Sequence, residues 1–382
     1  MSLLETIANG ENSGVEFKDE RVLAGDLAEE IVAFANGYGG SIYIGVADDG
    51  TVLGVSRPDI ETWLMNICRE NCRPALIPYF EMPELAGKKI AVLHIPKGIN
   101  KPYQTVQGKY YIRVGSTKRL ASKEELLRLF QASSLVHYDV APVAGSSMAD
   151  LDIYKLTDYF KRFYQVDLQQ EECEKILLNS EILVPLDQHS VCSVGGLLIF
   201  GRAPQKYLPQ AELSYAYFRG ADIGAELLDK KNISGSLTDL VDKTQDLILL
   251  NTPVPSTIIG MKREEQIAYP KTVIREALVN AVLHRDYSIY GAKIRVFQFS
   301  DRIQFYSPGR LPNSVTVEKM KTTISVPRNP FLLKYMENYR YIDGLGRGIP
   351  MIMRQMRQLN APEPLLIEDG EEFVLTVFRA IF

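Results

Sequence analysis

Glu276 and Asn280 lie four residues apart in the stretch REALVNAVLHRDY, residues 275–287. Residues at positions i and i+4 share one face of a helix, so this carboxylate and this amide can address the same ligand. A carboxylate can orient a water molecule, and an amide oxygen can bind Mg²⁺. The spacing therefore predicts a pocket suited to a nucleotide and its metal ion.

The alternative is that Glu276 and Asn280 simply form the solvated face of a helix. They interrupt an apolar run that leaves little of the helix to face water: Val273, Ile274, Ala277, Leu278, Val279, Ala281, Val282 and Leu283. Two glycine-bearing segments follow, SPG at 307–309 and GLGRG at 344–348. Because glycine lacks a Cβ, backbone at such positions can approach a phosphate closely. This order of segments favours the nucleotide pocket.

Composition describes an ordinary globular protein. The chain has 382 residues, 46% hydrophobic and 24% charged, enough for two or three domains. A net charge of −4 argues against a globally basic nucleic-acid binder. The four cysteines do not complete a metal-ligand set, so we expect reduced thiols. Neither a targeting segment nor a membrane-spanning run is evident, which predicts a cytoplasmic protein without a membrane partner.

The first part of the chain, 1–136, alternates helix and strand signals. A capping box at Asp26 to Glu29 predicts a helix that ends at Asn36-Gly37, and the run SIYIGV (41–46) predicts a strand. Further strands are expected at 89–95 and 109–114, and a helix at Ser122, with Glu125 three residues later. This pattern is typical of a mixed α/β domain.

The remainder divides less clearly. The run HYDVAPVAGSSMAD, 137–150, predicts a linker. A connecting region, 151–260, would hold two helices within 152–183, an apolar strand at 191–200, a strand at 212–218 and a helix at 237–250. A last domain, 261–382, would end near a strand at 373–378. The expected fold class is α/β (α+β).

A basic stretch from Lys101 to Lys123 carries six cations and no acid, with tyrosines interleaved. Cations neutralise phosphates and aromatic rings stack on bases, so this stretch predicts a nucleic-acid surface. The alternative is a hairpin whose exposed face simply carries lysines. The candidate residues are Lys101, Tyr103, Lys109, Tyr111, Arg113, Lys118 and Arg119.

The segments YPKTVIREALVNAVLHRDY (269–287), DRIQFYSPGRLP (301–312), RNPFL (328–332) and GLGRGI (344–349) resemble the RecG-related Bergerat-type ATP-binding domain, HATPase_c_4. The resemblance implies an α/β sandwich that binds ATP and Mg²⁺, with Glu276 activating water and Asn280 binding the metal. Ser307 stands where the wider fold has an adenine-binding Asp. The implied cofactor-binding residues are Asn280, Ser307, Gly309, Gly344, Gly346, Arg347 and Gly348, and Arg328 and Asn329 are further candidates for phosphate contacts.

The segments ENSGVEFKDE (11–20), AFANGYGGSIYIGVADDGTVLGV (33–55) and GKYYIRVGS (108–116) resemble the Schlafen AlbA_2 domain. In Schlafen nucleases an acidic trio holds a divalent metal, and Glu11, Glu16 and Asp48 are the nearest matches here. Their carboxylates could hold Mg²⁺ or Mn²⁺ for RNA or DNA cleavage. The alternative is that Glu16 pairs with Lys18 and that Asp48 shapes a turn.

Together these features predict a cytoplasmic, nucleic-acid-associated transcriptional regulator in which bound ATP acts as a switch. Because Ser307 replaces the usual adenine-binding Asp, we expect nucleotide binding rather than catalysis. Weak ATP hydrolysis is left as an open alternative. One alternative is a metal-dependent nuclease, and another is a degenerate scaffold that binds no nucleotide. The partners expected are DNA or RNA, a nucleotide and a second copy of the chain.

Overall fold

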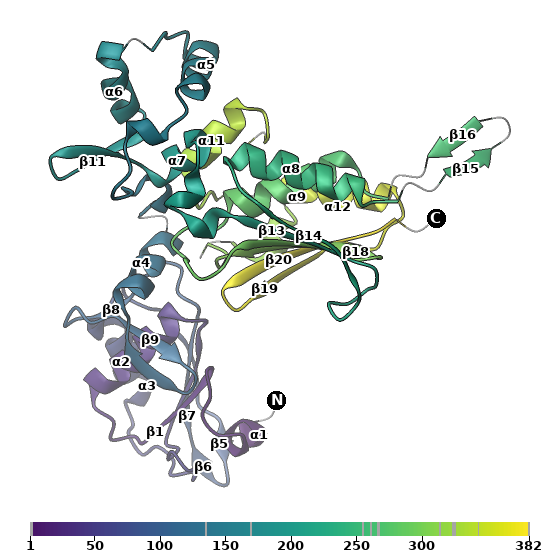
Figure 1. Ribbon diagram of the computed structural model, residues 1–382. Helices are drawn as coiled ribbons and strands as arrows, with labels where there is room; N and C mark the ends of the chain where they lie inside the picture. The colour runs from purple at the N-terminus through teal and green to yellow at the C-terminus, as the bar shows by residue number, and fades with distance from the viewer. Residues whose placement is uncertain are drawn as a thin grey trace. The chain divides into compact units, whose positions relative to one another are not determined.

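The computed structural model describes residues 3–133, 136–168, 170–253, 256–259, 262–265, 268–312, 315–322, 326–342 and 344–380. The chain forms two compact units, Met1–Val136 and His137–Phe382. The division falls at the end predicted for the first domain. Helices and strands are mixed in both units (Figure 1), as the expected α/β class requires.

The first unit is built on a four-stranded sheet in the order β1–β2–β7–β4. Strands β1 (Val15–Lys18) and β2 (Gly40–Ile44) are parallel because α2 (Ala24–Asn36) connects them, whereas β7 (Ala91–Ile95) and β4 (Tyr79–Glu81) continue the sheet antiparallel. The remaining elements are α1 (Leu3–Ala8), α3 (Ile60–Asn66), the π-helix η1 (Ile67–Asn71), β3 (Cys72–Arg73), β5 (Glu84–Leu85), β6 (Lys88–Lys89), β8 (Gln104–Thr105), β9 (Tyr111–Val114), β10 (Thr117–Leu120) and α4 (Lys123–Ala132).

The two helix starts predicted in this unit have different outcomes. Ser122 caps α4 in a box with Glu125, as predicted. Helix α2 instead begins at Ala24, and its N-cap Leu23 makes no side-chain hydrogen bond, so the Asp26 capping box is wrong. Tertiary packing replaces the cap there, because most of α2 is buried in the core.

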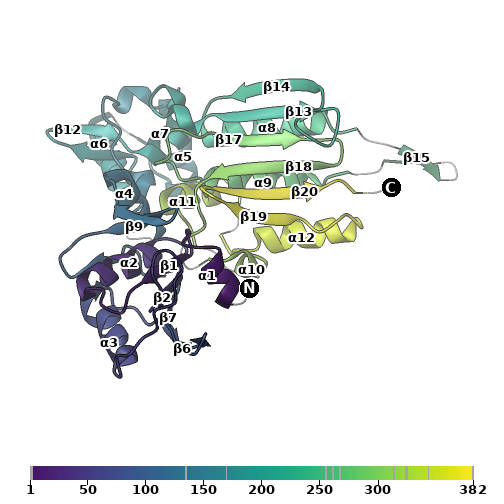
Figure 2. The same cartoon turned by 90° about the horizontal axis from the view of Figure 1, so that it is seen from below.

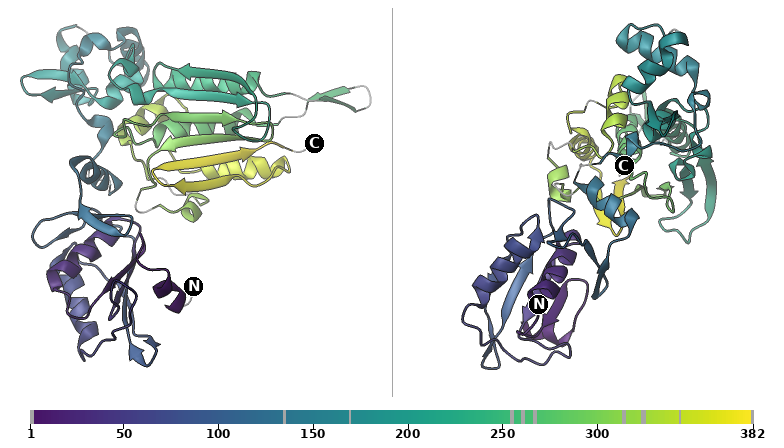
Figure 3. Two further views of the ribbon diagram at one scale, coloured as in Figure 1. Left: turned by 60° about the horizontal axis from the view of Figure 1, so that its bottom comes forward. Right: turned by 90° about the vertical axis from the view of Figure 1, so that its left-hand side faces the viewer.

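The second unit contains a six-stranded sheet in the order β14–β13–β17–β18–β20–β19 (Figure 2). Helices α8, α9 and α12 cover one face of this sheet, and the left view of Figure 3 shows the strands in front of them. The bounds are β13 (Leu213–Phe218), β14 (Leu227–Ile233), α8 (Leu237–Leu250), α9 (Lys271–Leu283), β17 (Ile294–Gln298), β18 (Arg302–Pro308), α10 (Val317–Met320), α11 (Pro330–Asn338), α12 (Gly348–Gln358), β19 (Leu365–Asp369) and β20 (Glu372–Phe378).

Buried and partly exposed side chains alternate along the strands of this sheet, because successive side chains of a strand point to opposite faces. In β18 the side chains of Ile303, Phe305 and Ser307 are buried, and the residues between them are partly exposed. This alternation aims Ser307 toward the layer of α9. The sheet and α9 therefore enclose the region where the predicted nucleotide residues meet.

A smaller group of elements precedes this sheet in the chain: α5 (Ile153–Tyr164), α6 (Gln170–Asn179), β11 (Leu183–Leu186), β12 (His189–Cys192) and α7 (Val194–Phe200). The ring of Tyr159 on α5 packs against Phe200 on α7 and Tyr335 on α11, at centroid distances of 5.3 and 4.8 Å. The described residues of this unit also form the short 3₁₀ turns η2 (Tyr138–Val140), η3 (Met148–Asp150), η4 (Pro204–Lys206) and η5 (Pro209–Ala211), and the hairpin of β15 (Ser256–Ile259) and β16 (Lys262–Glu265).

The strand predicted for 191–200 is wrong. Strand β12 ends at Cys192, and Ser193 then caps helix α7 by accepting a hydrogen bond from the Gly196 N–H at 2.9 Å. Every residue of α7 is buried, so the helix shows no polar face. A short, uniformly apolar run cannot be distinguished from a buried strand by its pattern.

The linker predicted for 137–150 is packed into the second unit. Asp139 in η2 is fully buried, and its Oδ2 accepts hydrogen bonds from the N–H groups of Phe331 at 2.8 Å and Leu332 at 3.2 Å. The carboxylate thereby caps the N-terminus of α11, where a negative charge is favourable. The segment 137–150 is therefore packed against α11 through Asp139 and is not an extended linker.

Asp139 predicts a pH dependence of stability. Burial raises the pKa of its carboxyl to about 6, although the Leu332 and Phe331 N–H groups lower it. Because the folded pKa lies above the unfolded value of 3.8, the contribution of Asp139 to the free energy of unfolding falls as pH rises from about 4 to 6. Asp139→Asn keeps a hydrogen-bond acceptor for α11 but cannot titrate. The pH-dependent part of the free energy of unfolding, about 3 kcal/mol in the wild type, should therefore be lost in this variant.

Urea unfolding of the wild type and Asp139→Asn at several pH values between 4 and 7 would measure this difference. The exposed Asp222→Asn is the matched control, and its difference from wild type should stay nearly constant with pH. A constant difference for Asp139→Asn as well would show that the Asp139 carboxyl titrates as an ordinary exposed acid.

Candidate functional site

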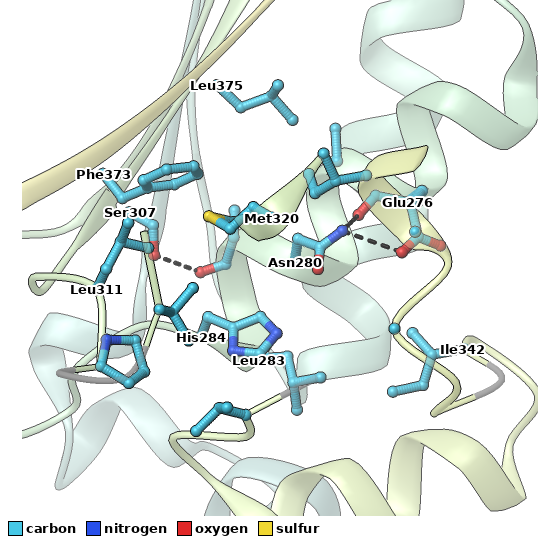
Figure 4. Close-up of a pocket in the computed structure, with 18 of the residues that line it drawn as sticks. Glu276, Asn280, Leu283, His284, Ser307, Leu311, Met320, Ile342, Phe373 and Leu375 are labelled. Carbon is cyan, nitrogen blue, oxygen red and sulfur yellow. Dashed lines mark hydrogen bonds between the residues drawn. The ribbon is translucent and has the colours of Figure 1, made fainter. Parts of the chain in front are cut away.

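A cavity with an empty volume of about 1100 Å³, partly open to solvent, lies in the second unit beside α9. Figure 4 shows it between α9, β18 and the segments that follow β18. The lining residues include eight of the ten nucleotide-site candidates from the sequence: Glu276, Asn280, Ser307, Gly309, Gly344, Gly346, Arg347 and Gly348. The fold therefore brings Glu276 and Gly348, which are 72 positions apart in the sequence, to the same cavity.

Glu276 and Asn280 lie on the cavity side of α9, as their spacing predicts. The Asn280 amide Nδ2 donates hydrogen bonds to the Glu276 backbone carbonyl at 2.8 Å and to its carboxylate Oε1 at 3.0 Å (Figure 4). Both bonds use the nitrogen, so they turn the Oδ1 oxygen of Asn280 away from Glu276. Oxygen atoms of this type are those that Mg²⁺ prefers.

The glycines around the cavity occupy positions that larger residues would disturb. Gly344 and Gly346 adopt φ angles of +65° and +66°, which favour glycine. A Cβ on Gly348, the first residue of α12, would lie 1.8 Å from Glu276 Oε1. Gly309 has a φ of +120°, and a Cβ there would lie 2.7 Å from the Asp286 Cβ. The backbone of α12 therefore approaches the Glu276 carboxylate directly.

Ser307 lies at the opposite side of the cavity from Glu276 (Figure 4). Its side chain is 6% exposed, and its Oγ donates a hydrogen bond to the Ala281 carbonyl on α9 at 2.8 Å. Apolar side chains surround it, among them Leu283, Leu311, Met320 and Phe373. The polar side chains of His284 and Arg310 line the same cavity.

His284 lines the cavity and was missed from the sequence. It is the C-cap of α9, eight positions after Glu276. Burial, and secondarily the positive charge of Arg328, lower the pKa of its imidazole to about 4. The ring is therefore neutral at physiological pH. A continuation of the i, i+4 series from Glu276 through Asn280 would have identified it.

Arg328 and Asn329 do not line the cavity, which corrects their assignment as phosphate contacts. Asn329 is buried, and its Nδ2 donates to the carbonyls of Leu283 and Arg285 at 2.7 and 2.9 Å, fixing the end of α9. Arg328 forms a buried ion pair with Asp286 at 3.1 Å and donates to the Arg310 carbonyl. The side chains of both residues are therefore bound to protein groups at the end of α9 and after β18.

The acidic trio of the nuclease alternative is not assembled. The side chain of Glu16 is bound by Arg113 at 2.7 Å and also by Lys18, while Glu11 accepts a hydrogen bond from the Phe17 N–H at 2.9 Å. Asp48 is exposed in the turn after β2. Within the described ranges, no three His, Cys, Asp or Glu residues form a group that could hold a metal ion. The nuclease prediction for these acids is therefore corrected: Glu16 serves an ion-pair network.

The predicted nucleic-acid surface is also corrected for most of its residues. Lys101, Tyr103 and Tyr111 are at most 8% exposed. The Lys101 Nζ donates to the Gly37 carbonyl at 2.7 Å, and the Tyr111 hydroxyl donates to Glu29 at 2.6 Å. These aromatic rings belong to the core of the first unit and not to a stacking surface.

The remaining cations of this stretch lie mostly opposite carboxylates. Arg113 pairs with Glu16 and Glu30, Lys118 pairs with Glu29 and Glu30, and Arg119 pairs with Glu125. Lys109 is exposed. The acids come from α2, β1 and α4, so the local excess of positive charge seen in sequence is neutralised in the fold.

None of the helices in the described part of the chain is long and apolar enough to cross a membrane.

Two family models match the chain. Residues 11–122 match the model "Schlafen, AlbA_2", and residues 291–377 match the model described as "Putative ATP-dependent DNA helicase recG C-terminal". The second match begins after α9, so Glu276 and Asn280 precede it. No curated protein matches the chain.

Solved structures provide a further comparison. The DIP2311 protein from Corynebacterium diphtheriae is 20% identical, with a TM-score of 0.50 over 96% of this chain and 75% of its own, which shows a similar fold. The N-terminal domain of a RecG-related protein from Nitrosomonas europaea is 24% identical over 31% of this chain and 91% of its own, with a TM-score of 0.25. With the two family matches, this chain carries an N-terminal Schlafen AlbA_2 domain and a C-terminal RecG-related domain of the HATPase_c_4 type.

Proposed function

We propose that the cavity binds ATP with Mg²⁺, and that its occupancy switches a nucleic-acid-associated regulator of transcription in the cytoplasm. The observation that carries this proposal is the convergence of eight of the ten nucleotide-site candidates on one cavity. The match at residues 291–377 to an ATPase-like family supports the same ligand.

The polar side of the cavity suits the phosphates and the metal ion. Asn280 Oδ1 and the Glu276 carboxylate supply oxygen donors for Mg²⁺, and Arg347 supplies a positive charge. Gly344, Gly346 and Gly348 lie at or just before the N-terminus of α12, an end of the helix that favours phosphate oxygens. The carboxylates of Glu337 and Glu276 lie directly beside Gly344 and Gly348. A bound Mg²⁺ would neutralise phosphate charge, and Glu276 is the carboxylate among the lining residues that could orient water if hydrolysis occurs.

A route for the switch lies within the second unit. Leu333 on α11 lines the cavity, and the N-terminus of α11 is held by Asp139. Asp139 follows the end of the first unit, Val136, by three residues. The segment after α11 is also anchored: Tyr341, just before the lining residues Ile342 and Gly344, donates its hydroxyl hydrogen bond to Asp242 on α8 at 2.6 Å. A ligand that shifts α11 would therefore act directly on the connection to the first unit.

The nucleic-acid part of the proposal is supported by the Schlafen AlbA_2 match at residues 11–122. It receives no support from the basic stretch, whose cations lie largely in ion pairs. Arg113, Lys118 and Arg119 therefore leave the proposed contact set, and Lys109 remains in it as an exposed cation.

Thermal unfolding of the full chain tests the nucleotide site. At ten times its dissociation constant, Mg²⁺–ATP is expected to raise the Tm by about 3–6 °C, because only the folded state binds it. Omitting Mg²⁺ or introducing Asn280→Ala should reduce the shift. The exposed helical residue Asn179, outside the cavity, provides the matched control Asn179→Ala, which should respond as wild type does. The absence of any shift at millimolar Mg²⁺–ATP would contradict the proposal.

A further inference from the structure

We infer that the carboxylate of Glu337 competes with the phosphates of a bound nucleotide for the backbone of the glycine segment, residues 344–348. This inference rests on the proposed nucleotide site and adds a regulatory residue on α11 that restrains it. Glu337 does not belong to the candidates predicted from the sequence. Its carboxylate has to move aside or be neutralised when a phosphate binds.

The Glu337 carboxylate lies directly against the backbone of Gly344. A Cβ on Gly344 would overlap Glu337 Oε1 and would lie 2.7 Å from Glu337 Cδ, so a larger residue would displace the carboxylate. Gly344 also has a φ of +65°, a conformation that favours glycine. The start of the glycine segment therefore accommodates an acidic side chain of the protein itself.

The same arrangement recurs at the other end of the segment. A Cβ on Gly348 would lie 2.7 Å from Glu276 Cδ. Gly348 is the first residue of α12, and the first N–H groups of a helix have no partner within it and attract anions. The carboxylates of Glu276 and Glu337 thus adjoin both ends of a segment whose chemistry suits phosphate oxygens.

The negative charge of Glu337 does not stabilise its own helix. Glu337 lies in the last turn of α11, which ends at Asn338, and the helix dipole disfavours an anion there. Across the described ranges, no ion pair includes Glu337. The Glu276 carboxylate, by contrast, accepts a hydrogen bond from the Asn280 amide at 3.0 Å. No side chain in these ranges therefore neutralises the charge that Glu337 presents to the glycine segment.

A phosphate beside Gly344 would meet this charge. Two anions at one backbone segment repel each other, and water screens them only in part, because the cavity is only partly open to solvent. Leu333, one turn before Glu337 on the same face of α11, lines the cavity. Phosphate binding would therefore act on the last turn of α11, the helix whose N-terminus Asp139 holds.

Isothermal titration calorimetry of the full chain with Mg²⁺–ATP tests this inference. Glu337→Gln keeps the shape of the side chain and removes its charge, so this variant should bind about tenfold more tightly than the wild type at about 0.05 M salt. The gain should shrink at about 0.5 M salt, because dissolved ions screen charges. Glu337→Asp keeps the charge and should gain less affinity than Glu337→Gln.

Glu318→Gln is the matched control for the loss of one negative charge. Glu318 is an exposed residue of α10, two positions before the lining residue Met320, and does not itself line the cavity. The dissociation constant of this variant should stay close to that of the wild type at both salt concentrations.

Equal or weaker binding by Glu337→Gln than by the wild type at low salt would overturn the inference and leave the nucleotide site standing. A gain of the same size at both salt concentrations would also overturn it, because a purely structural effect does not depend on screening. If neither the wild type nor Glu337→Gln binds Mg²⁺–ATP, both the nucleotide site and the inference fall. Glu337→Ala takes the place of Glu337→Gln if that variant does not fold, with the same expected gain.

Discussion

Replacing Arg113 with methionine is expected to lower the free energy of unfolding of the first unit by up to about 3–5 kcal/mol. The guanidinium pairs with Glu16 at 2.7 Å and Glu30 at 3.2 Å, and its side chain is 4% exposed. Burial and the nearby Glu16 charge already raise the pKa of the Glu30 carboxyl. Removing this cation would leave the two buried carboxylates repelling each other, with the less buried Lys18 and Lys118 as their remaining partners.

Amide hydrogen exchange of α2 and β1 in the full chain would measure this loss locally. Arg119→Met is the matched control, because Arg119 lies in the same hairpin and pairs with Glu125 at 2.6 Å but is 49% exposed. An exposed pair of this kind contributes at most about 1 kcal/mol. Similar losses in the two variants would mean that burial of the Arg113 network does not contribute to stability.

Gly348→Ala is expected to weaken binding of Mg²⁺–ATP by at least about tenfold. A Cβ at this position would lie 1.8 Å from Glu276 Oε1 and 3.3 Å from Asn280 Nδ2, so the Glu276 carboxylate must leave its present place. Because a carboxylate at the end of a flexible side chain can move, the fold should tolerate the change. The displaced carboxylate and the added methyl would then disturb the phosphate side of the cavity.

Gly25→Ala is the matched control for this variant. Gly25 also lies in the first turn of a helix, α2, and a Cβ there would meet no atom within 4 Å. Both substitutions favour the helical backbone by similar amounts, so a difference in nucleotide affinity reports the cavity itself. Calorimetric titration with Mg²⁺–ATP would measure it, and unchanged affinity in Gly348→Ala would place the phosphates away from α12.

The candidate site was predictable because its signals are local. The four-residue spacing of Glu276 and Asn280 fixes their common face once α9 forms, since 3.6 residues make a helical turn. Positive φ at Gly344 and Gly346 likewise follows from residue type and nearby turns. His284 lies on the same helix and could have been predicted by the same spacing, whereas the apolar surroundings of Ser307 depend on distant segments.

The sequence alone determined which segments are helices and strands where capping or periodicity is strong, as in α4 at Ser122 and in α8. Only the tertiary structure decided which charges face solvent. Arg113 meets Glu16 across 97 positions, and Asp139 caps α11 across 192, and no local pattern encodes either contact. The physical reason is that periodicity and capping act between near neighbours in the chain, whereas neutralisation and burial depend on which distant segments the fold brings together.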